Sequence, residues 1–350
     1  MSSNGARITL VAKGVQDVYL MGEPNSTYFK QTYQRHTNFA MATINQVIEG
    51  AVANGTRTTV DFGRISDLLS YIYIFDNSSR ETKTIEFIDK VELLIGGQVI
   101  SEMTQNELYA WEAYMSNNQS KSDGGNAGAG PYNQCVQPLH FWFCDNWGAA
   151  LPLCALQNSS VKMNIYWKDS GDPVSSKTWV CKANYIFLDN DERRQFTQAP
   201  KLEYLIQQWQ RTSVLTADTL RVPLEFNHPI LSLFLMGTVD NGTILNRIKV
   251  LANGNELFKG RLIEFAKMPY WHTSNAKLDI KRTMFPFCLD IASCQPSGSC
   301  NFSRLDNVTF VFDDGFSLGT PALGADNVIH AVNWNVLKIA KGMGGLTFAN

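Results

Sequence analysis

The sequence predicts an all-β protein that contains two similar antiparallel β-sandwiches, and three observations support this. Short apolar stretches follow one another with turn residues between most of them, which is typical of a β-sandwich or jelly roll rather than a parallel α/β sheet. A hairpin followed by a helix occurs twice at a constant spacing. The chain has 350 residues, 44% of them hydrophobic, so it is long enough for two cores.

Most of the expected strands lie in the first half of the chain, and one helix interrupts them. The helix is expected at 106–115, because Leu108, Trp111 and Met115 recur on one face at i, i+3 and i+7. The strands are rich in β-branched and aromatic residues, which favour extended backbone. They are expected at 39–48, 56–62, 68–75, 87–95, 139–143 and 161–167, with a further strand at 308–312.

The repeated unit is the strongest internal evidence for duplication. A Gly-Gly turn at Gly97 and an Asn-Gly turn at Gly254 each follow an apolar strand, and Gly254 lies 157 residues after Gly97. Both dipeptides suit the positive φ angles of a two-residue hairpin. A helical pattern follows each hairpin, at 262–268 in the second half. We therefore expect the two halves to superpose, with Gly97 over Gly254 and Trp111 near Met268.

The two copies are expected to join at 188–200. Asp189 is a candidate N-cap, acidic residues and then arginines follow it, and Pro200 closes the segment. This order suits a short helix, and a charged loop is the alternative. Either structure would act as a connector.

A Gly-rich segment at 120–132 is too poor in apolar groups to pack. We interpret it as a dispensable surface loop. A phosphate-binding loop is a poor alternative, because proline and not lysine follows Gly130.

Composition and charge argue against several classes of function. The net charge is −2, and no block of Lys or Arg is present to neutralise nucleic-acid phosphates. No apolar run approaches the roughly 18 to 20 residues of a membrane span, and the N-terminal one is too short for a signal peptide. An odd number of cysteines without a secretory signal favours free buried thiols over disulfides. The seven cysteines are Cys135, Cys144, Cys154, Cys181, Cys288, Cys294 and Cys300.

We find no pattern that predicts catalysis, a metal site or a cofactor. The five histidines are scattered without metal-ligand spacing, no Cys-x-x-Cys pair exists, and no Gly-x-Ser-x-Gly elbow is present. The eight tryptophans suggest sugar stacking as one alternative, but we expect most of them to fill cores and subunit contacts. The histidines are His36, His140, His228, His272 and His330.

The segment 295–307 combines a turn with the start of a strand. Pro296 and Gly298 favour a turn, and the apolar strand at 308–312 follows. On an extended chain Arg304 and Asp306 would share a face and bond to neighbouring strands or chains, with a solvated ion pair as the alternative.

This segment resembles the signature of the major capsid proteins of nucleocytoplasmic large DNA viruses, the double jelly-roll family. Further similar stretches, spread from one end of the chain nearly to the other, follow in the family's order. They are the segments 14–22, 28–41, 188–196, 203–210 and 331–350.

The resemblance implies two tandem antiparallel eight-stranded jelly rolls with short helices in the connections. It implies an N-terminal arm at the capsomer base (1–26), a first jelly roll (27–189), a connector (190–200) and a second jelly roll (201–350). Members of the family commonly carry large outer loop insertions, and this chain has little room for them. A thin capsomer with low relief is therefore expected.

The implied function is that of a major capsid protein, not an enzyme. It would form a homotrimer, a pseudo-hexagonal capsomer that tiles an icosahedral shell in the virion after assembly in host cytoplasm. The implied partners are neighbouring capsomers, minor capsid proteins and an internal membrane, without direct nucleic-acid contact. The alternatives are a minor capsid or scaffold paralogue, and a jelly-roll carbohydrate-binding module.

Overall fold

The computed structural model describes two separate units of the chain. Its described residues are 11–24, 28, 35–78, 83–115, 136–169, 173–213, 215, 221–237, 247–273, 282–312 and 326–348. The first unit is Met1–Asn38 and the second, the body, is Phe39–Asn350. In the first unit a 3-10 turn, η2 (Val15–Asp17), leads into the one-turn helix α2 (Val18–Met21). No described residue of this unit is buried.

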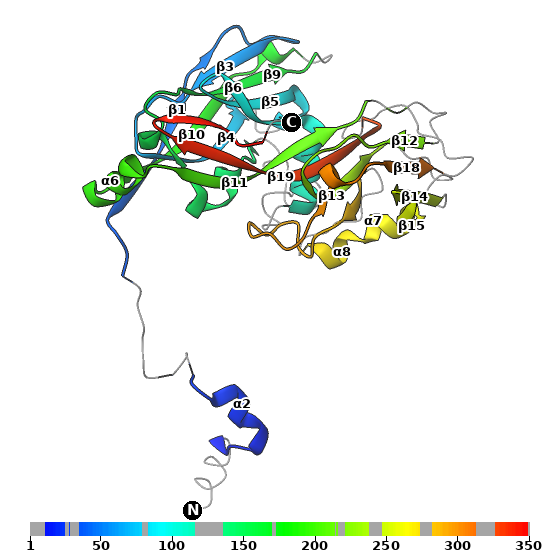
Figure 1. Cartoon of the computed structure of the whole chain (residues 1–350). Helices are drawn as coiled ribbons and strands as arrows, with labels where there is room; N and C mark the ends of the chain where they lie inside the picture. The colour runs from blue at the N-terminus through cyan, green and yellow to red at the C-terminus, as the bar shows by residue number, and fades with distance from the viewer. Residues whose placement is uncertain are drawn as a thin grey trace, which may run out of the picture. The chain divides into compact units, whose positions relative to one another are not determined.

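Residues 39–188 of the body form the first sandwich (Figure 1), two antiparallel sheets with an apolar core between them. The core forms because alternate side chains of each strand point inward, as Met163 and Ile165 do in the central strand β9. One sheet contains, in order, β1 (Phe39–Gln46), β10 (Trp179–Leu188), β4 (Leu68–Asp76) and β7 (Val136–Pro138), with β8 (Leu151–Pro152) beside β4. The other contains β2 (Ile48–Glu49), β3 (Arg57–Asp61), β9 (Val161–Trp167), β5 (Ile88–Ile95) and β6 (Gln98–Thr104).

Residues 202–346 form the second sandwich with the same strand order, so the chain is a double jelly roll. One sheet contains β11 (Leu202–Arg211), β19 (Val328–Ala340), β13 (Pro229–Met236) and β16 (Arg282–Pro286), with β17 (Cys300–Asn301) beside β13 and β20 (Met343–Leu346) beside β19. The other contains β12 (Arg221–Pro223), β18 (Val308–Phe312), β14 (Arg247–Ala252) and β15 (Asn255–Arg261).

Short helical segments lie in the connections of the body, and among the described residues no helix is long and apolar enough to cross a membrane. They are α3 (Thr84–Phe87), α4 (Gln105–Ala110), the π-helical turn η3 (Trp111–Met115), α5 (Trp142–Asp145), η6 (Trp147–Ala149), η7 (Leu153–Ala155), η8 (Val174–Ser176), α6 (Asn190–Gln198), α7 (Leu262–Lys267), α8 (Pro269–His272) and η10 (Phe302–Arg304).

The long strand β19 contributes to both cores. Its first half faces the core of the second sandwich through Ile329 and Ala331. Its last residues, Leu337 and Ile339, are buried in the core cluster of the first sandwich, together with Ile206 of β11. The first core is therefore completed by residues that come from the far end of the chain.

The two expected glycine turns lie on equivalent hairpins, β5–β6 and β14–β15. Gly97 and Gly254 have φ angles of 86° and 81°, and the residue before each also has positive φ. Each hairpin carries one register shift, after Leu93 in the first and after Val250 in the second. These two residues are again 157 apart, which confirms the duplicated unit.

The connector between the sandwiches is the helix α6. Its N-cap is Asp189, whose carboxylate accepts a hydrogen bond from the amide of Glu192 at 2.9 Å, as the sequence predicts. Arg193 then reaches back to Asp67, with Nε–Oδ1 at 2.7 Å. Burial raises the pKa of the Asp67 carboxyl, but the hydrogen bonds from Arg193 and from the amide of Leu188 hold it below its ordinary value.

Two expectations for local structure are wrong. The segment 139–143 is not a strand, because β7 ends at Pro138 and the chain turns into α5, where Cys144 N bonds to Phe141 O at 2.8 Å. Arg304 lies in the single turn η10 and not on an extended chain with Asp306; both side chains are exposed. The expected turn residue Gly298 does have positive φ, 133°. The expected loop 120–132 lies outside the described residues.

Alanine at either hairpin glycine should test the two turns. Gly97→Ala and Gly254→Ala should each lower the free energy of unfolding by about 1 to 2 kcal/mol, because a Cβ is unfavourable at positive φ, although no atom lies within 4 Å of its position. The control is Gly63→Ala, where φ is not positive and the nearest atom is 3.9 Å away. Urea unfolding of the three variants measures the difference. A Gly254→Ala variant as stable as Gly63→Ala would contradict the turn geometry.

Candidate functional site: the joint between the sandwiches

A capping box fixes the start of α4, a helix of the first sandwich that packs against the second sandwich. The hydroxyl of Thr104 accepts a hydrogen bond from the amide of Glu107 at 3.4 Å, and Glu107 Oε2 accepts one from the amide of Thr104 at 2.7 Å. This exchange satisfies two amides at the start of α4. It also holds the Glu107 carboxylate in one position, with its second oxygen available for the neighbouring sandwich.

The helical segment α4–η3 packs on the outer face of the sheet β11–β19–β13. Tyr114 lies against Phe234, with ring centroids 5.9 Å apart, and its hydroxyl donates to the carbonyl oxygen of Arg282 at 2.5 Å. The contact forms a third apolar cluster, separate from the two sandwich cores. Its buried members are Ile85, Met103, Leu108, Ala110, Trp111, Tyr114, Met115, Trp209, Leu231, Phe234, Met236, Met284, Cys288, Ile291, Val332 and Trp334.

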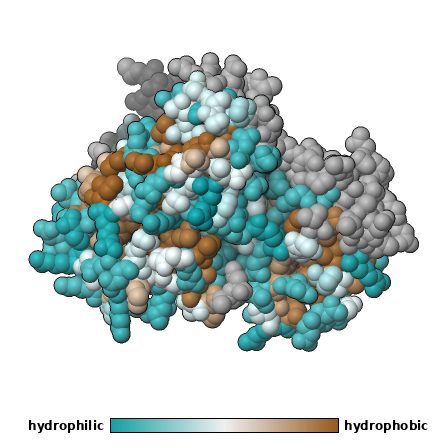
Figure 2. Space-filling view, turned by 90° about the horizontal axis from the view of Figure 1, so that it is seen from above, coloured by the Kyte–Doolittle hydropathy of each residue, from teal (hydrophilic) through white to brown (hydrophobic). Residues whose placement is uncertain are grey.

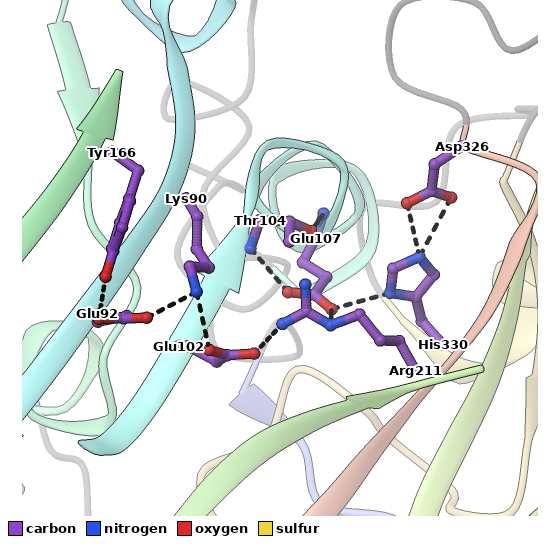
Figure 3. Close-up of polar contacts among 9 residues, drawn as sticks. All are labelled: Lys90, Glu92, Glu102, Thr104, Glu107, Tyr166, Arg211, Asp326 and His330. Atoms are coloured by element: carbon purple, nitrogen blue, oxygen red, sulfur yellow. Dashed lines mark hydrogen bonds and ion pairs between the residues drawn. The ribbon is translucent and has the colours of Figure 1, made fainter. Parts of the chain in front are cut away.

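Charged side chains cross this apolar contact (Figure 3). Glu107 Oε1 lies 2.8 Å from Nδ1 of His330 on β19, and both side chains are fully buried. The other ring nitrogen of His330 lies 3.0 Å from Oδ2 of Asp326. Arg211 on β11 adds a second cation, with Nε 3.8 Å from Glu107 Oε1. Each buried charge therefore has a partner of opposite charge, as a buried ion pair requires.

The chain of charges continues into the first sandwich with alternating sign. Arg211 also contacts the carboxylate of Glu102 on β6. Lys90 on β5 lies between two carboxylates, 3.5 Å from Glu102 and 2.6 Å from Glu92. Glu92 in turn accepts a hydrogen bond from the hydroxyl of Tyr166 at 3.0 Å (Figure 3). The network thus connects the sheet of the first sandwich to the sheet of the second.

The network sets the protonation of its buried members. Burial alone would lower the pKa of His330, but hydrogen bonds to Asp326 and Glu107 outweigh it and raise the pKa to about 9. Burial alone would raise the pKa of Glu107 and of Asp326, but His330 holds both carboxyl groups below their ordinary values. At neutral pH His330 is therefore a cation between two carboxylates.

A hollow borders the joint, and residues from both sandwiches line it. The ring of His140 stacks on Trp111 at 3.6 Å, and its Nδ1 lies 3.5 Å from Asp145 Oδ1. The indole rings of Trp142 and Trp334 form part of the wall. The hollow thus has aromatic walls and belongs to the same joint.

The residues considered from the sequence do not come together as a catalytic or metal site. Among the described residues no three His, Cys, Asp or Glu side chains are placed to hold a metal ion. The described cysteines form no disulfide, and Cys181 and Cys288 are buried. Of the tryptophans, only Trp147 and Trp271 are largely exposed, so most of these rings fill cores and the joint, as expected.

The joint could not be seen in the sequence. His330 is there one of five scattered histidines, and its partner Glu107 is 223 residues away. Two local signals were present: the capping box at Thr104, and a histidine inside the apolar strand 328–332. Neither signal indicates that the two segments meet.

The pKa of His330 gives a testable pH dependence. Its folded value, about 9, is above its ordinary value of 6.5. Its contribution to stability is therefore complete below pH 6.5 and is lost as the pH rises through 9. The loss should amount to about 3 kcal/mol, measured by urea unfolding at pH 6.5 and 9.5 and one protein concentration. His330→Gln should be less stable at pH 6.5 and should lack this loss.

The control for this measurement is Glu86→Gln, which removes the half-exposed ion pair with Lys83. It should keep the pH dependence of the unchanged protein. An unchanged protein that is equally stable at both pH values would contradict the protonated His330.

Two family models of viral capsid proteins match this chain. Residues 27–206 match the family model of the major capsid protein N-terminus, and residues 237–345 match that of the large eukaryotic DNA virus major capsid protein. The major capsid protein of Pyramimonas orientalis virus is 34% identical, covering 99% of this chain and 100% of that relative. That of Paramecium bursaria Chlorella virus 1 is 30% identical with the same coverage.

Solved structures agree with these matches. One is VP54 of Paramecium bursaria Chlorella virus 1 (PBCV-1), as fitted into a reconstruction of the virophage Sputnik. It superposes with a TM-score of 0.74 at 27% identity, and the match covers 93% of this chain and all of that chain. The Faustovirus major capsid protein shares the fold, with a TM-score of 0.67 at 10% identity, covering 96% of each chain. With both halves matched and relatives aligned over nearly its full length, the chain belongs to the major capsid proteins of large eukaryotic DNA viruses.

Proposed function

We propose that the chain assembles as a homotrimer, whose six jelly rolls form a pseudo-hexagonal capsomer of an icosahedral shell. The observation that carries this proposal is the apolar surface left on the body. Phe39, Met41, Tyr71, Tyr270 and Trp271 are all exposed, and brown hydrophobic patches interrupt the hydrophilic surface in Figure 2. Exposed apolar patches of this kind mark protein contacts.

Composition supports the same proposal. Charged residues make up 18% of the chain, below the roughly 25% that is usual in soluble domains. Three copies of a duplicated chain present six similar sandwiches, which suits a site with six neighbours. The function is thus to form interfaces, without a catalytic step, a cofactor or direct contact with nucleic acid.

The proposed domain division follows the expectation: arm 1–26, first jelly roll 27–189, connector 190–200 and second jelly roll 201–350. The alignment to the Pyramimonas orientalis virus protein runs over 405 positions, more than the 350 residues of this chain. Segments present in that relative are therefore missing here. This supports a capsomer with a low outer surface.

We place the arm at the base of the capsomer, facing minor capsid proteins and an internal membrane, in a shell assembled in host cytoplasm. The described apolar residues of the arm support an attachment role, because Val15, Tyr19 and Leu20 are exposed and would be covered by a partner. Contacts with neighbouring capsomers complete the shell.

The purified chain should be a trimer of about three times 39.2 kDa. Light scattering coupled to size-exclusion chromatography measures this at moderate and at high salt. The trimer should persist at high salt, because salt screens surface ion pairs but not apolar contacts. A monomer under both conditions would contradict the proposed capsomer.

Deleting residues 1–26 should leave the trimer intact and prevent incorporation into shells. No described residue of the arm is itself buried. Deleting the arm should therefore not change the melting temperature of the body. Scattering and virion incorporation are the two measurements. The control carries a Gly-Ser sequence of equal length in place of the arm and should behave like the deletion; normal incorporation of either variant would show that the arm attaches nothing.

A further inference from the structure

The joint within the chain has two halves. Each sandwich contains one of these halves and also an equivalent of the other. One half is the helical segment α4–η3, and the other is the outer face of β11–β19–β13. The equivalents are α7–α8 in the second sandwich and the outer face of β1–β10–β4 in the first. Both leave large apolar side chains in solvent: Trp271 on α8 is 70% exposed and Met41 on β1 is 62% exposed.

Strand register shows which residues of the two sheets are equivalent. Ile72 pairs with Ala183 in the first sheet, and Leu233 pairs with Ala331 in the second; all four are buried. Beyond this pair the register shifts by one residue in both sheets. Residues 69–71 lie against 184–185 in the first sheet, and residues 230–232 lie against 332–333 in the second. The two pairs therefore occupy the same place in the two sheets.

The adjacent pairs, which point to the outer face, are then equivalent as well. They are Tyr73 with Lys182 in the first sheet and Phe234 with His330 in the second. The ammonium group of Lys182 lies 5.5 Å from the centre of the Phe75 ring, above the outer face. The first sheet thus carries a lysine cation where the second sheet carries the His330 cation of the joint.

The helices are related by the 157-residue spacing of the hairpins. Glu264 lies 157 residues after Glu107, and Trp271 lies 157 after Tyr114. Glu264 closes the start of α7 as Glu107 closes that of α4, because its Oε2 accepts a hydrogen bond from the amide of Arg261 at 3.3 Å. Unlike Glu107, Glu264 is exposed.

We infer that a second copy of this chain covers the outer face of β1–β10–β4 with its α7–α8 segment. Glu264 of one chain then faces Lys182 of the other, as Glu107 faces His330 within the chain. Trp271 packs against Tyr73, as Tyr114 packs against Phe234. The inference rests on the proposed trimer and specifies which surfaces form its contact.

Charge complementarity supports a second copy as the partner. The sheet residues were matched by strand register and the helix residues by the hairpin spacing, and these two matches are independent. They nevertheless bring a carboxylate opposite an ammonium group and an indole opposite a phenol ring. The contact is head-to-tail, so each chain uses both surfaces, and a closed ring of three chains leaves neither surface open.

Charge reversal tests the contact. In Lys182→Glu two carboxylates would meet at every chain contact, and in Glu264→Lys two ammonium groups would meet. Each single variant should raise the trimer dissociation constant about 100-fold or more, because like charges at an interface are strongly unfavourable. The double variant Lys182→Glu/Glu264→Lys restores opposite charges and should return the constant to within about tenfold. Sedimentation velocity over a dilution series measures the constants.

The controls are Lys162→Glu and Glu49→Lys, two reversals on the other sheet of the first sandwich, which should leave the constant unchanged. Far-UV circular dichroism checks that every variant is folded. If the single reversals have no effect on a stable trimer, the inference is wrong and the proposed function still stands. The same conclusion follows if the double variant stays dissociated. An unchanged chain that never forms trimers would overturn the proposed function itself.

Discussion

The carboxylate of Glu107 is charged and fully buried, and this places a strong constraint on the body of the protein. Such a charge is stable only with cations at short distance. His330 and Arg211 meet the requirement from two adjacent strands of the second sandwich. A different docking of the two sandwiches would leave the carboxylate without partners. The pair therefore selects one arrangement, while the apolar cluster around it supplies most of the attraction.

The same type of contact, a helix packed on the outer face of a sheet, occurs within the chain and in the inferred contact between chains. Within the chain, a helix of one sandwich covers the sheet of the next. Between chains, the inferred contact repeats this arrangement with Lys182 in place of His330. The two cations differ in burial: His330 is fully enclosed between two carboxylates, whereas Lys182 lies above a sheet face that is open within one chain. The contact between chains therefore depends on assembly to cover its charges.

Local features of the fold were predictable from the sequence. The strand at 161–167, the cap at Asp189 and the turns at Gly97 and Gly254 each depend on a few neighbouring residues, and the structure confirms them. The segment 139–143 shows where such reasoning fails, because its apolar residues are buried as well by a turn and the one-turn helix α5 as they would be by a strand. The joint could not be predicted in this way, because its partners are far apart in sequence and only the fold brings them together.

The shared strand β19 has a consequence for the synthesis of this protein on the ribosome. The first sandwich contains its own sheets by residue 188, yet Ile206, Leu337 and Ile339 fill part of its core. The nascent first half must therefore wait, with apolar surface uncovered, until nearly the whole chain has emerged. A chain that stopped early would keep that surface exposed and be open to chaperones and proteases. Only chains translated almost to the end can thus supply finished subunits to a growing shell.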